Sequence, residues 1–258
     1  MPTALITGAS SGIGKAFAQE LAARNTNLVL VARSEEKLSQ LAKQLQEQHN
    51  IQVDVIVKDL TEPNAAASVF DATKAKGLTI DLLINNAGFG SYGDFAEGDG
   101  EKQVKIVQLN ILALVDLTHK FLPLMRQRRS GSIINVSSIT AFQPIPYLSV
   151  YAASKAFILS FSEALWAENY HYGVRILVTC PGPIETNFFA EANFPPALAG
   201  STDKVYSCEK VVWESLEALD KGYPTVISSD STTQIRSKLS RLVPRKLLLN
   251  MLAKRFKA

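Results

Sequence analysis

The stretch that decides the fold is Thr3-Ala4-Leu5-Ile6-Thr7-Gly8-Ala9-Ser10-Ser11-Gly12-Ile13-Gly14, near the start of a chain of 258 residues. Thr3–Thr7 is a short, mostly apolar run that predicts a buried strand, while Gly12–Arg24 has the pattern of an amphipathic helix. Glycines at such a junction permit a tight turn and close approach to a pyrophosphate, which the helix N-terminus stabilises. The spacing is GxxxGxG rather than the commoner GxGxxG. Its position between strand and helix favours a phosphate-binding turn.

Short apolar runs and longer amphipathic segments continue to alternate over the first 180 residues. Strands are expected at Leu28–Ala32, Val53–Val57, Leu82–Asn85, Ile133–Val136 and Arg175–Thr179, and helices at Glu35–Gln48, Glu62–Lys76, Glu101–Leu122 and Val150–Tyr172. Strands that are apolar throughout fit a parallel sheet covered on both faces. Regular alternation of this kind implies right-handed crossovers. The expected fold is α/β: a Rossmann-like doubly wound parallel sheet with helices on both faces, in a single domain.

Three residues predict where individual helices begin and end. Ser34 can cap the helix that opens at Glu35, and Thr61 can cap the helix that opens at Glu62. Pro123 is expected to end or bend the long fourth helix.

Cysteine and histidine usage excludes several classes of protein. Cys180 and Cys208 form no CxxC motif or Cys/His cluster, which argues against a disulfide scaffold or a zinc site and suits a reducing compartment. His49, His119 and His171 are scattered without metal-ligand spacing. We find no signal peptide and no apolar run of membrane-spanning length, so a cytoplasmic location is expected.

The net charge of +3 conceals an uneven distribution. No acidic residue follows Asp230, whereas eight lysines and arginines do, which leaves the preceding chain at −5. A chain-wide nucleic-acid binder is therefore disfavoured. We divide the chain into residues 1–230, a cofactor-binding and catalytic domain, and residues 231–258, a basic amphipathic tail. A helix over Arg245–Ala258 could contact an anionic membrane peripherally, or pack on the body or on a sister subunit, and the acidic body favours packing.

The end of the second predicted strand bears on cofactor choice. NAD-binding proteins usually carry an acid there for the ribose hydroxyls, but this chain has Ala32 and Arg33. The guanidinium of Arg33 suits a 2′-phosphate, so NADP is favoured over NAD. Asp59, after the third strand, could accept a hydrogen bond from an adenine amino group or could equally cap the turn before Thr61.

A group of polar residues predicts acid–base chemistry. Tyr151 and Lys155 lie four apart on one helix, so they share a face, and a nearby ammonium lowers the pKa of a tyrosine. Ser138 directly follows the fifth strand and could hold a carbonyl oxygen. Asn110 interrupts an apolar helix and needs a buried partner. Taken singly, each also fits an ordinary structural role.

Together these residues resemble the short-chain dehydrogenase/reductase family, from Thr3 to about Asn187. The resemblance lies in Thr7-Gly8-x-x-x-Gly12-x-Gly14, Asn85-Asn86-Ala87-Gly88, Asn110, Ser138, Tyr151-Ala152-Ala153-Ser154-Lys155 and Pro181-Gly182. The compact branch of that family has one Rossmann-like domain and forms dimers or tetramers. A homodimer or homotetramer is therefore expected.

The resemblance also implies roles for the catalytic residues. Tyr151 would be the general acid–base, Lys155 would lower its pKa and hold the nicotinamide ribose, and Ser138 would orient the substrate oxygen. Asn110 would hold a water that links Lys155 to solvent. The implied NADP(H) site comprises Gly8, Ser10, Ser11, Gly12, Ile13, Gly14, Arg33, Asp59, Leu60, Asn86, Ala87, Gly88, Tyr151, Lys155, Pro181, Gly182, Ile184 and Thr186.

The substrate half is expected to be apolar. Residues 187–207, rich in phenylalanine and proline, would form a lid, and Phe89 and Phe142–Leu148 would face the same pocket. The expected function is NADP(H)-dependent interconversion of a carbonyl and a secondary alcohol on a hydrophobic ketone, 3-oxoacyl or steroid-like substrate. The alternative is a catalytically silent NADP(H)-binding sensor or scaffold on the same fold.

Overall fold

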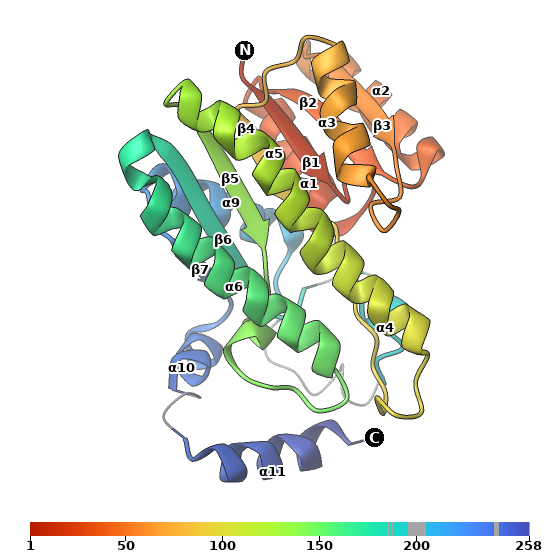
Figure 1. The fold of residues 1–258 in the computed structure, drawn as a ribbon, viewed down its shortest axis with the longest axis vertical. Coiled ribbons are helices and arrows are strands. Elements are labelled where there is room, and N and C mark those ends of the chain that lie inside the picture. Colours follow the sequence, from red (N-terminus) through yellow and green to blue (C-terminus); the bar gives the residue numbers. More distant parts are fainter. Residues whose placement is uncertain (185, 187, 196–204, 240–242, 258) are drawn as a thin grey trace.

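A seven-stranded sheet forms the centre of the computed structural model, which describes residues 1–184, 186, 188–195, 205–239 and 243–257 (Figure 1). Every strand pairs with its neighbours in parallel, in the order β3-β2-β1-β4-β5-β6-β7. The strands are β1 (Thr3–Thr7), β2 (Asn27–Ala32), β3 (Val53–Val57), β4 (Leu82–Asn85), β5 (Gly131–Val136), β6 (Val174–Pro181) and β7 (Thr225–Ser228). The predicted doubly wound parallel sheet is confirmed.

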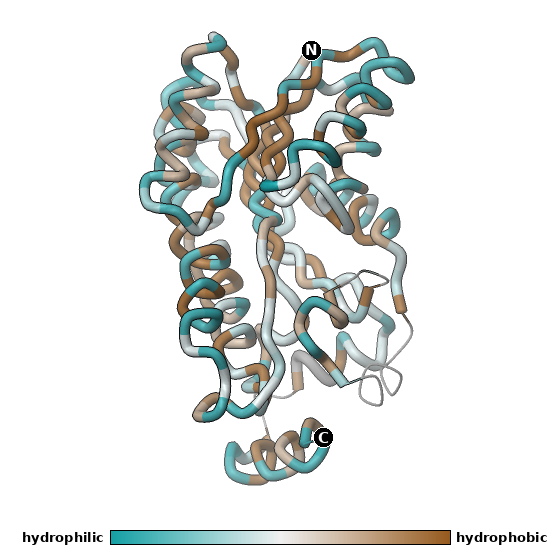
Figure 2. Tube along the Cα trace, turned by 90° about the vertical axis from the view of Figure 1, so that its right-hand side faces the viewer, coloured by the Kyte–Doolittle hydropathy of each residue, from teal (hydrophilic) through white to brown (hydrophobic). Residues whose placement is uncertain are grey.

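Helices cover both faces of the sheet (Figure 1). One face is covered by α1 (Gly12–Ala23), α2 (Glu35–His49) and α9 (Cys208–Asp220), the other by α3 (Ala65–Ala75), α5 (Leu114–Gln127) and α6 (Ser149–Asn169). Fully buried side chains such as Phe17 on α1 and Met125 on α5 fill the two layers. Figure 2 shows the hydrophobic strands running through the middle, as expected for strands buried on both faces.

The strand order reverses between β1 and β4, which places a ligand site at their carboxyl ends. The Thr7 hydroxyl joins the two strands there, because it accepts hydrogen bonds from the backbone N–H groups of Asn86 and Ala87, both at 3.0 Å. The Asn86 side chain donates in return to the Thr7 carbonyl at 2.9 Å. The glycine turn and the Asn86 segment are therefore held together without any ligand.

The fourth helical stretch differs from its prediction. It runs from α4 (Gly100–Val107) through a π-helical turn (Gln108–Ala113) into α5, which continues to Gln127 with Pro123 inside it. The prediction that the helix ends at Pro123 is wrong. The buried neighbours Phe121, Leu122 and Met125 anchor this part of the helix to the core, which outweighs the one backbone hydrogen bond that proline removes.

Two predicted helix caps also need correction. Helix α3 begins at Ala65 with Asn64 at its cap, three residues after the predicted start, because the Asp59 carboxylate accepts hydrogen bonds from the Thr61 N–H and hydroxyl and holds Thr61 in a turn. Ser34 does occupy the cap position of α2, but its side chain makes no capping hydrogen bond.

The chain beyond residue 187 holds elements that the sequence analysis did not assign. Helix α9 and strand β7 extend the sheet by a further crossover, and short helices α7 (Phe188–Glu191) and α10 (Ser231–Leu239) lie beside them in sequence. The tail does form a helix, α11 (Arg245–Phe256), whose exposed surface carries both apolar and basic side chains. Of the predicted lid, residues 187 and 196–204 lie outside the described residues. Among the described residues, no helix is both long and apolar enough to span a bilayer.

Candidate active site

A cleft of about 900 Å³ opens at the carboxyl ends of the strands and contains most of the predicted site. Its lining includes Gly8, Ser10, Ser11, Gly12, Ile13, Arg33, Asp59, Leu60, Asn86, Ala87, Gly88, Ser138, Tyr151, Lys155, Pro181, Gly182, Ile184 and Thr186. Gly14 and Asn110 lie behind the wall and do not line it. The volume and mixed lining fit a cofactor together with a small molecule.

The glycine turn forms one end of the cleft, where the sequence predicts the pyrophosphate. Gly8 has a φ of +67°, which side chains other than glycine rarely adopt, and its N–H donates to the Val31 carbonyl at 2.8 Å. Gly14 serves a different purpose, since a Cβ at this position would lie 2.3 Å from the Gly8 carbonyl oxygen. Ser11 occupies the cap position of α1 without a side-chain capping bond, so the helix N-terminus faces the cleft with donors for an anion.

Exposed cations line the cleft where the sequence predicts the adenosine of the cofactor. The Arg33 side chain is 79% exposed, and its nearest carboxylate is Asp59, with Nη1 3.8 Å from Oδ2. Burial raises the pKa of Asp59, but the Thr61 hydrogen bonds and the Arg33 charge together hold it below its ordinary value. Asp59 thus caps the turn before Thr61, one of its two predicted roles. Lys37, on the first turn of α2, also lines the cleft and was not predicted.

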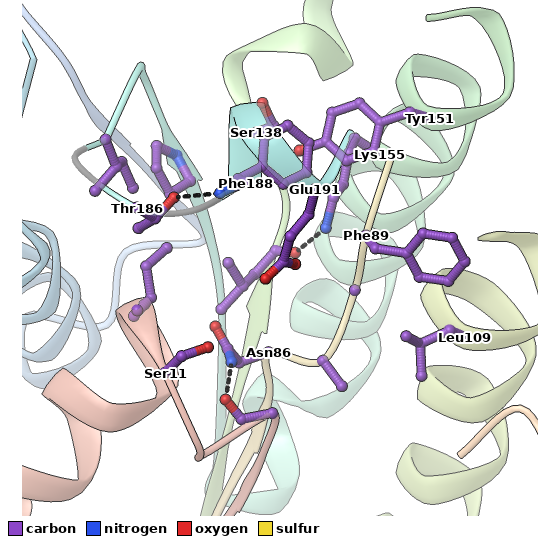
Figure 3. Close-up of a pocket in the computed structure, with 18 of the residues that line it drawn as sticks. Ser11, Asn86, Phe89, Leu109, Ser138, Tyr151, Lys155, Thr186, Phe188 and Glu191 are labelled. Atoms are coloured by element: carbon purple, nitrogen blue, oxygen red, sulfur yellow. Dashed lines mark hydrogen bonds between the residues drawn. The ribbon is translucent and has the colours of Figure 1, made fainter. Parts of the chain in front are cut away.

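Ser138 and Tyr151 meet at the other end of the cleft. Ser138 directly follows β5 and Tyr151 is on the first turn of α6. Figure 3 shows both side chains in the cleft, and the Ser138 hydroxyl is near enough to that of Tyr151 to influence its protonation. Burial raises the pKa of Tyr151 to about 12, although the hydrogen bond from Ser138 opposes the shift. The sequence predicts a lowered pKa, so the protein without ligand differs from that expectation because desolvation dominates.

Lys155 lies one turn beyond Tyr151, and only 4% of it is exposed. Its ammonium donates to the Val136 carbonyl at 2.9 Å and lies 5.6 Å from the centre of the Tyr151 ring. Burial lowers the pKa of Lys155 to about 8. Desolvation therefore destabilises the charged form of Lys155. Its ammonium lies next to Tyr151, close enough to stabilise the Tyr151 phenolate.

Asn110 is fully satisfied by hydrogen bonds within the protein. Its Oδ1 accepts from the Phe89 N–H at 3.1 Å, and its Nδ2 donates to the Phe89 carbonyl and the Ser154 hydroxyl. It lies on the π-helical turn, a local widening that often accompanies functional residues. The Asn110 side chain therefore braces the segment that follows Gly88, while the predicted water-holding role remains a prediction.

Aromatic side chains form the wall opposite the cofactor turn. The ring of Phe188 lies 5.0 Å from that of Tyr151, and Phe89, Phe189 and Phe194 also line the cleft. Their predicted position around the pocket is confirmed for these described residues.

Two further lining residues were not predicted. Phe256 comes from the end of α11, where the Tyr92 hydroxyl donates to its backbone carbonyl at 2.5 Å. Glu191, on α7, points its carboxylate into the cleft (Figure 3). No group of three or more His, Cys, Asp or Glu side chains that could hold a metal ion occurs within the described part of the chain.

The buried charge of Lys155 gives a stability prediction. The pKa of Lys155 is about 8 in the folded chain against an ordinary value of 10.5, so between these values the unfolded chain binds more protons. The folded state consequently gains stability from this group as pH rises through that window, and below pH 8 it carries the whole cost of the buried ammonium. We expect Lys155→Met to raise the free energy of unfolding by on the order of 1 kcal/mol at pH 7.

Denaturant unfolding between pH 7 and pH 9.5 measures this effect. The difference in the free energy of unfolding between Lys155→Met and wild type should become smaller towards pH 9.5, where wild-type Lys155 is largely neutral. Lys43→Met, at an exposed position on α2, serves as the control and should change little at any pH. A Lys155→Met protein that is less stable than wild type by the same amount at every pH would contradict the prediction.

The fold and the site together define a Rossmann-type dinucleotide-binding protein with a tyrosine–lysine pair beside the ligand cleft. The family model described as short chain dehydrogenase matches residues 2–195. The chain belongs to this family.

Curated relatives and solved structures agree with that assignment. The very-long-chain 3-oxoacyl-CoA reductase of Anas platyrhynchos is 38% identical over 71% of this chain and 60% of its own length. The protein named inactive hydroxysteroid dehydrogenase-like protein 1 of Homo sapiens is 35% identical over 74% of this chain and 58% of its own length. The chain thus spans about 60% of the length of such relatives.

A solved structure covers nearly the whole chain. The short-chain dehydrogenase from Sphingobium yanoikuyae in complex with NADPH has 31% sequence identity and a TM-score of 0.85, over 97% of this chain and 95% of that chain.

Proposed function

We propose that this chain is an NADP(H)-dependent oxidoreductase that interconverts a carbonyl and a secondary alcohol. The observation that carries the proposal is the meeting of Ser138, Tyr151 and Lys155 in the same cleft as the glycine turn. A nucleotide-binding protein without chemistry has no need of a buried tyrosine beside a buried ammonium. Perturbed titratable groups in a cleft are typical of catalytic sites.

The residues of the cleft fit NADP(H). The free N-terminus of α1 and the glycine turn would hold the pyrophosphate, and Arg33 with Lys37 would hold the 2′-phosphate. The similar Sphingobium protein binds NADPH, which supports the assignment. When bound, the cofactor supplies or accepts a hydride at its nicotinamide ring.

The chain's own residues would move and hold the proton. A tyrosine with a pKa of about 12 keeps its proton at neutral pH, and a developing alkoxide is a much stronger base than a phenolate. Tyr151 can therefore donate to the carbonyl oxygen during reduction, and the nearby Lys155 ammonium would stabilise the phenolate that remains. Ser138 would hold the same oxygen through its hydroxyl, which already reaches Tyr151.

The apolar wall favours a hydrophobic ketone, 3-oxoacyl or steroid-like substrate. Phe89, Phe188, Phe189 and Phe194 offer much ring surface near the reacting end of the cleft, where the Glu191 carboxylate is the charged exception. The duck relative is named for a 3-oxoacyl thioester, which agrees with this class. A panel of small polar ketones, bulky ketones, ketosteroids and 3-oxoacyl thioesters with NADPH tests the proposal. Highest kcat/KM on the small polar ketones would contradict it.

Phe256 should influence bulky substrates more than small ones. It lines the cleft next to the apolar cluster of Ile145 and Phe194, so Phe256→Ala should remove contact area that only a large substrate reaches. We expect KM for a bulky ketone to rise about tenfold, which corresponds to partial loss of one aromatic contact, with little change in kcat or for a small ketone. Steady-state kinetics measure this, with Phe95→Ala, at an exposed position, as control. An equal rise for both ketones would contradict the assigned position.

We also propose a homo-oligomer in a reducing compartment. Val104, Leu112 and Phe157, on the α4–α5 stretch and on α6, expose apolar side chains that a sister subunit would cover. Cys180 is a free, buried thiol, which agrees with reducing conditions. The second candidate function is a catalytically silent NADP(H) sensor. The observation that favours it is the similarity to the human relative that is named inactive.

A further inference from the structure

Helix α11 lies across the end of the molecule at which the cleft opens. In both Figures 1 and 2 it forms the lower edge of the structure. Its own Leu248 and Leu252 are buried, and Phe256 at its end packs with the cluster of Ile145 and Phe194. The Tyr92 hydroxyl fastens the far end of the helix through the Phe256 carbonyl at 2.5 Å. The helix is thus held to the body by one side only.

The apolar surface of α11 is wider than the body covers. Leu247 and Met251, one turn apart, are 54% and 58% exposed, and Leu249 on the opposite flank of the buried side is 40% exposed. Side chains four apart on a helix lie next to each other, so Leu247 and Met251 make a continuous apolar edge. That edge faces solvent in the monomer.

Basic side chains occupy the rest of the exposed surface of α11. Arg245, Lys246, Lys254 and Arg255 are exposed, Lys257 follows directly, and the sequence has no acidic residue after Asp230. Residues 1–230 have a net charge of −5, whereas every charged residue after them is basic, so net positive charge is concentrated in the C-terminal tail. Lysine side chains are long enough to reach lipid phosphates while the apolar edge inserts below them.

We propose that α11 is an interfacial helix that seats the open end of the cleft on an anionic lipid bilayer. A helix with an apolar edge flanked by lysines and arginines and without acidic residues has the character of a helix that lies in the plane of a membrane surface. Juxtaposed basic residues add electrostatic attraction to anionic lipids. The proposal concerns the surface and does not depend on the chemistry of the cleft.

A second copy of the chain is the rival occupant of this surface. Three exposed apolar side chains on one short helix offer little of the area that a stable protein interface buries. Two copies of α11 placed together would also bring their lysines close to one another, which is unfavourable. An anionic bilayer satisfies both the charge and the narrow apolar edge, so the observations favour lipid.

Co-sedimentation of the full chain with vesicles tests the proposal. We expect binding to mixed phosphatidylcholine–phosphatidylserine vesicles, weakened by added salt, and little binding to pure phosphatidylcholine. Lys246→Glu combined with Lys254→Glu should lower the affinity at least about tenfold, because each reversal removes an attraction and adds a repulsion. Leu247→Ser combined with Met251→Ser should also weaken binding by removing the inserted edge.

The matched control reverses two exposed lysines elsewhere. Lys43→Glu combined with Lys74→Glu changes the net charge equally on α2 and α3 and should leave vesicle binding nearly unchanged. Thermal unfolding of each variant verifies that the fold is retained. Equal loss in the control and α11 variants, or no binding by wild type, would overturn the proposal. So would an α11 variant whose only change, seen by analytical ultracentrifugation, is loss of self-association.

Discussion

Tyr151→Phe should lower kcat for carbonyl reduction by about a thousandfold or more while NADPH binding stays unchanged. The substitution removes one hydroxyl oxygen from a buried position and leaves the ring, with its contact to Phe188, in place. General acid catalysis by a positioned side chain contributes about 10²–10⁴-fold, and Tyr151 holds the only proton that the proposed mechanism delivers to the substrate oxygen. The hydride can still approach, but the alkoxide that forms has no donor.

The control for Tyr151→Phe is the loss of a hydroxyl group from another tyrosine near α6. Tyr170→Phe removes a hydroxyl from an exposed tyrosine at the end of α6 and should retain full activity. NADPH affinity by fluorescence titration and kcat by NADPH oxidation are measured on all three proteins. Retention of substantial activity in Tyr151→Phe would remove this tyrosine from the mechanism.

Arg33→Asp should reverse the cofactor preference. The guanidinium is largely exposed at the adenosine end, where it can pair with a 2′-phosphate, and a carboxylate in its place repels that phosphate but accepts hydrogen bonds from a free ribose. Charge-assisted hydrogen bonds contribute about 1.5–3 kcal/mol, so we expect kcat/KM for NADPH to fall about 10–100-fold. The value for NADH should rise or stay level. The ratio of the two values measures the preference.

Lys37→Ala measures the contribution of Lys37 to 2′-phosphate binding separately from that of Arg33. It removes the second positive side chain without introducing a negative one, and it should lower kcat/KM for NADPH severalfold and leave that for NADH unchanged. An Arg33→Asp protein that loses activity equally with both cofactors would indicate damage to the site rather than loss of phosphate recognition.

The first two thirds of the fold could be predicted because the signals there are local. Strands buried on both faces are apolar at every position, and the glycine turn after Thr7 requires a φ that only glycine adopts easily. The pairing of Tyr151 with Lys155 could be predicted because the two residues lie four apart in a predicted helix. Helix boundaries were less accurate where a side chain such as Asp59 forms a competing turn.

The structural features that were not predicted from the sequence were missed for different reasons. Helix α9 carries a usable signal, since Ser207 caps it by accepting from the Lys210 N–H and buried apolar residues recur at helical spacing. Strand β7 has only four residues and lies between polar segments, so its strand character comes from pairing with β6. Phe256 contacts Tyr92 from 164 residues away, which no local pattern encodes.

The pKa of Tyr151 was predicted in the wrong direction for the protein without ligand. The lysine four residues away suggested a lowered value, but the sequence does not reveal how completely the ring is buried or that the Lys155 ammonium is bound to the Val136 carbonyl. Desolvation depends on tertiary packing, so spacing alone cannot rank it against a neighbouring charge.

Transfer of deuterium from NADPH labelled at the nicotinamide C4 to a ketone is the most direct test of the proposed activity. The label should appear at the carbinol carbon of the alcohol product, detected by mass spectrometry, with a bulky ketone, a ketosteroid or a 3-oxoacyl thioester. The Tyr151→Phe protein should bind the labelled cofactor but form at most traces of product. NADPH binding by the wild-type chain without deuterium transfer to any member of the panel would contradict the enzyme assignment and favour the silent sensor.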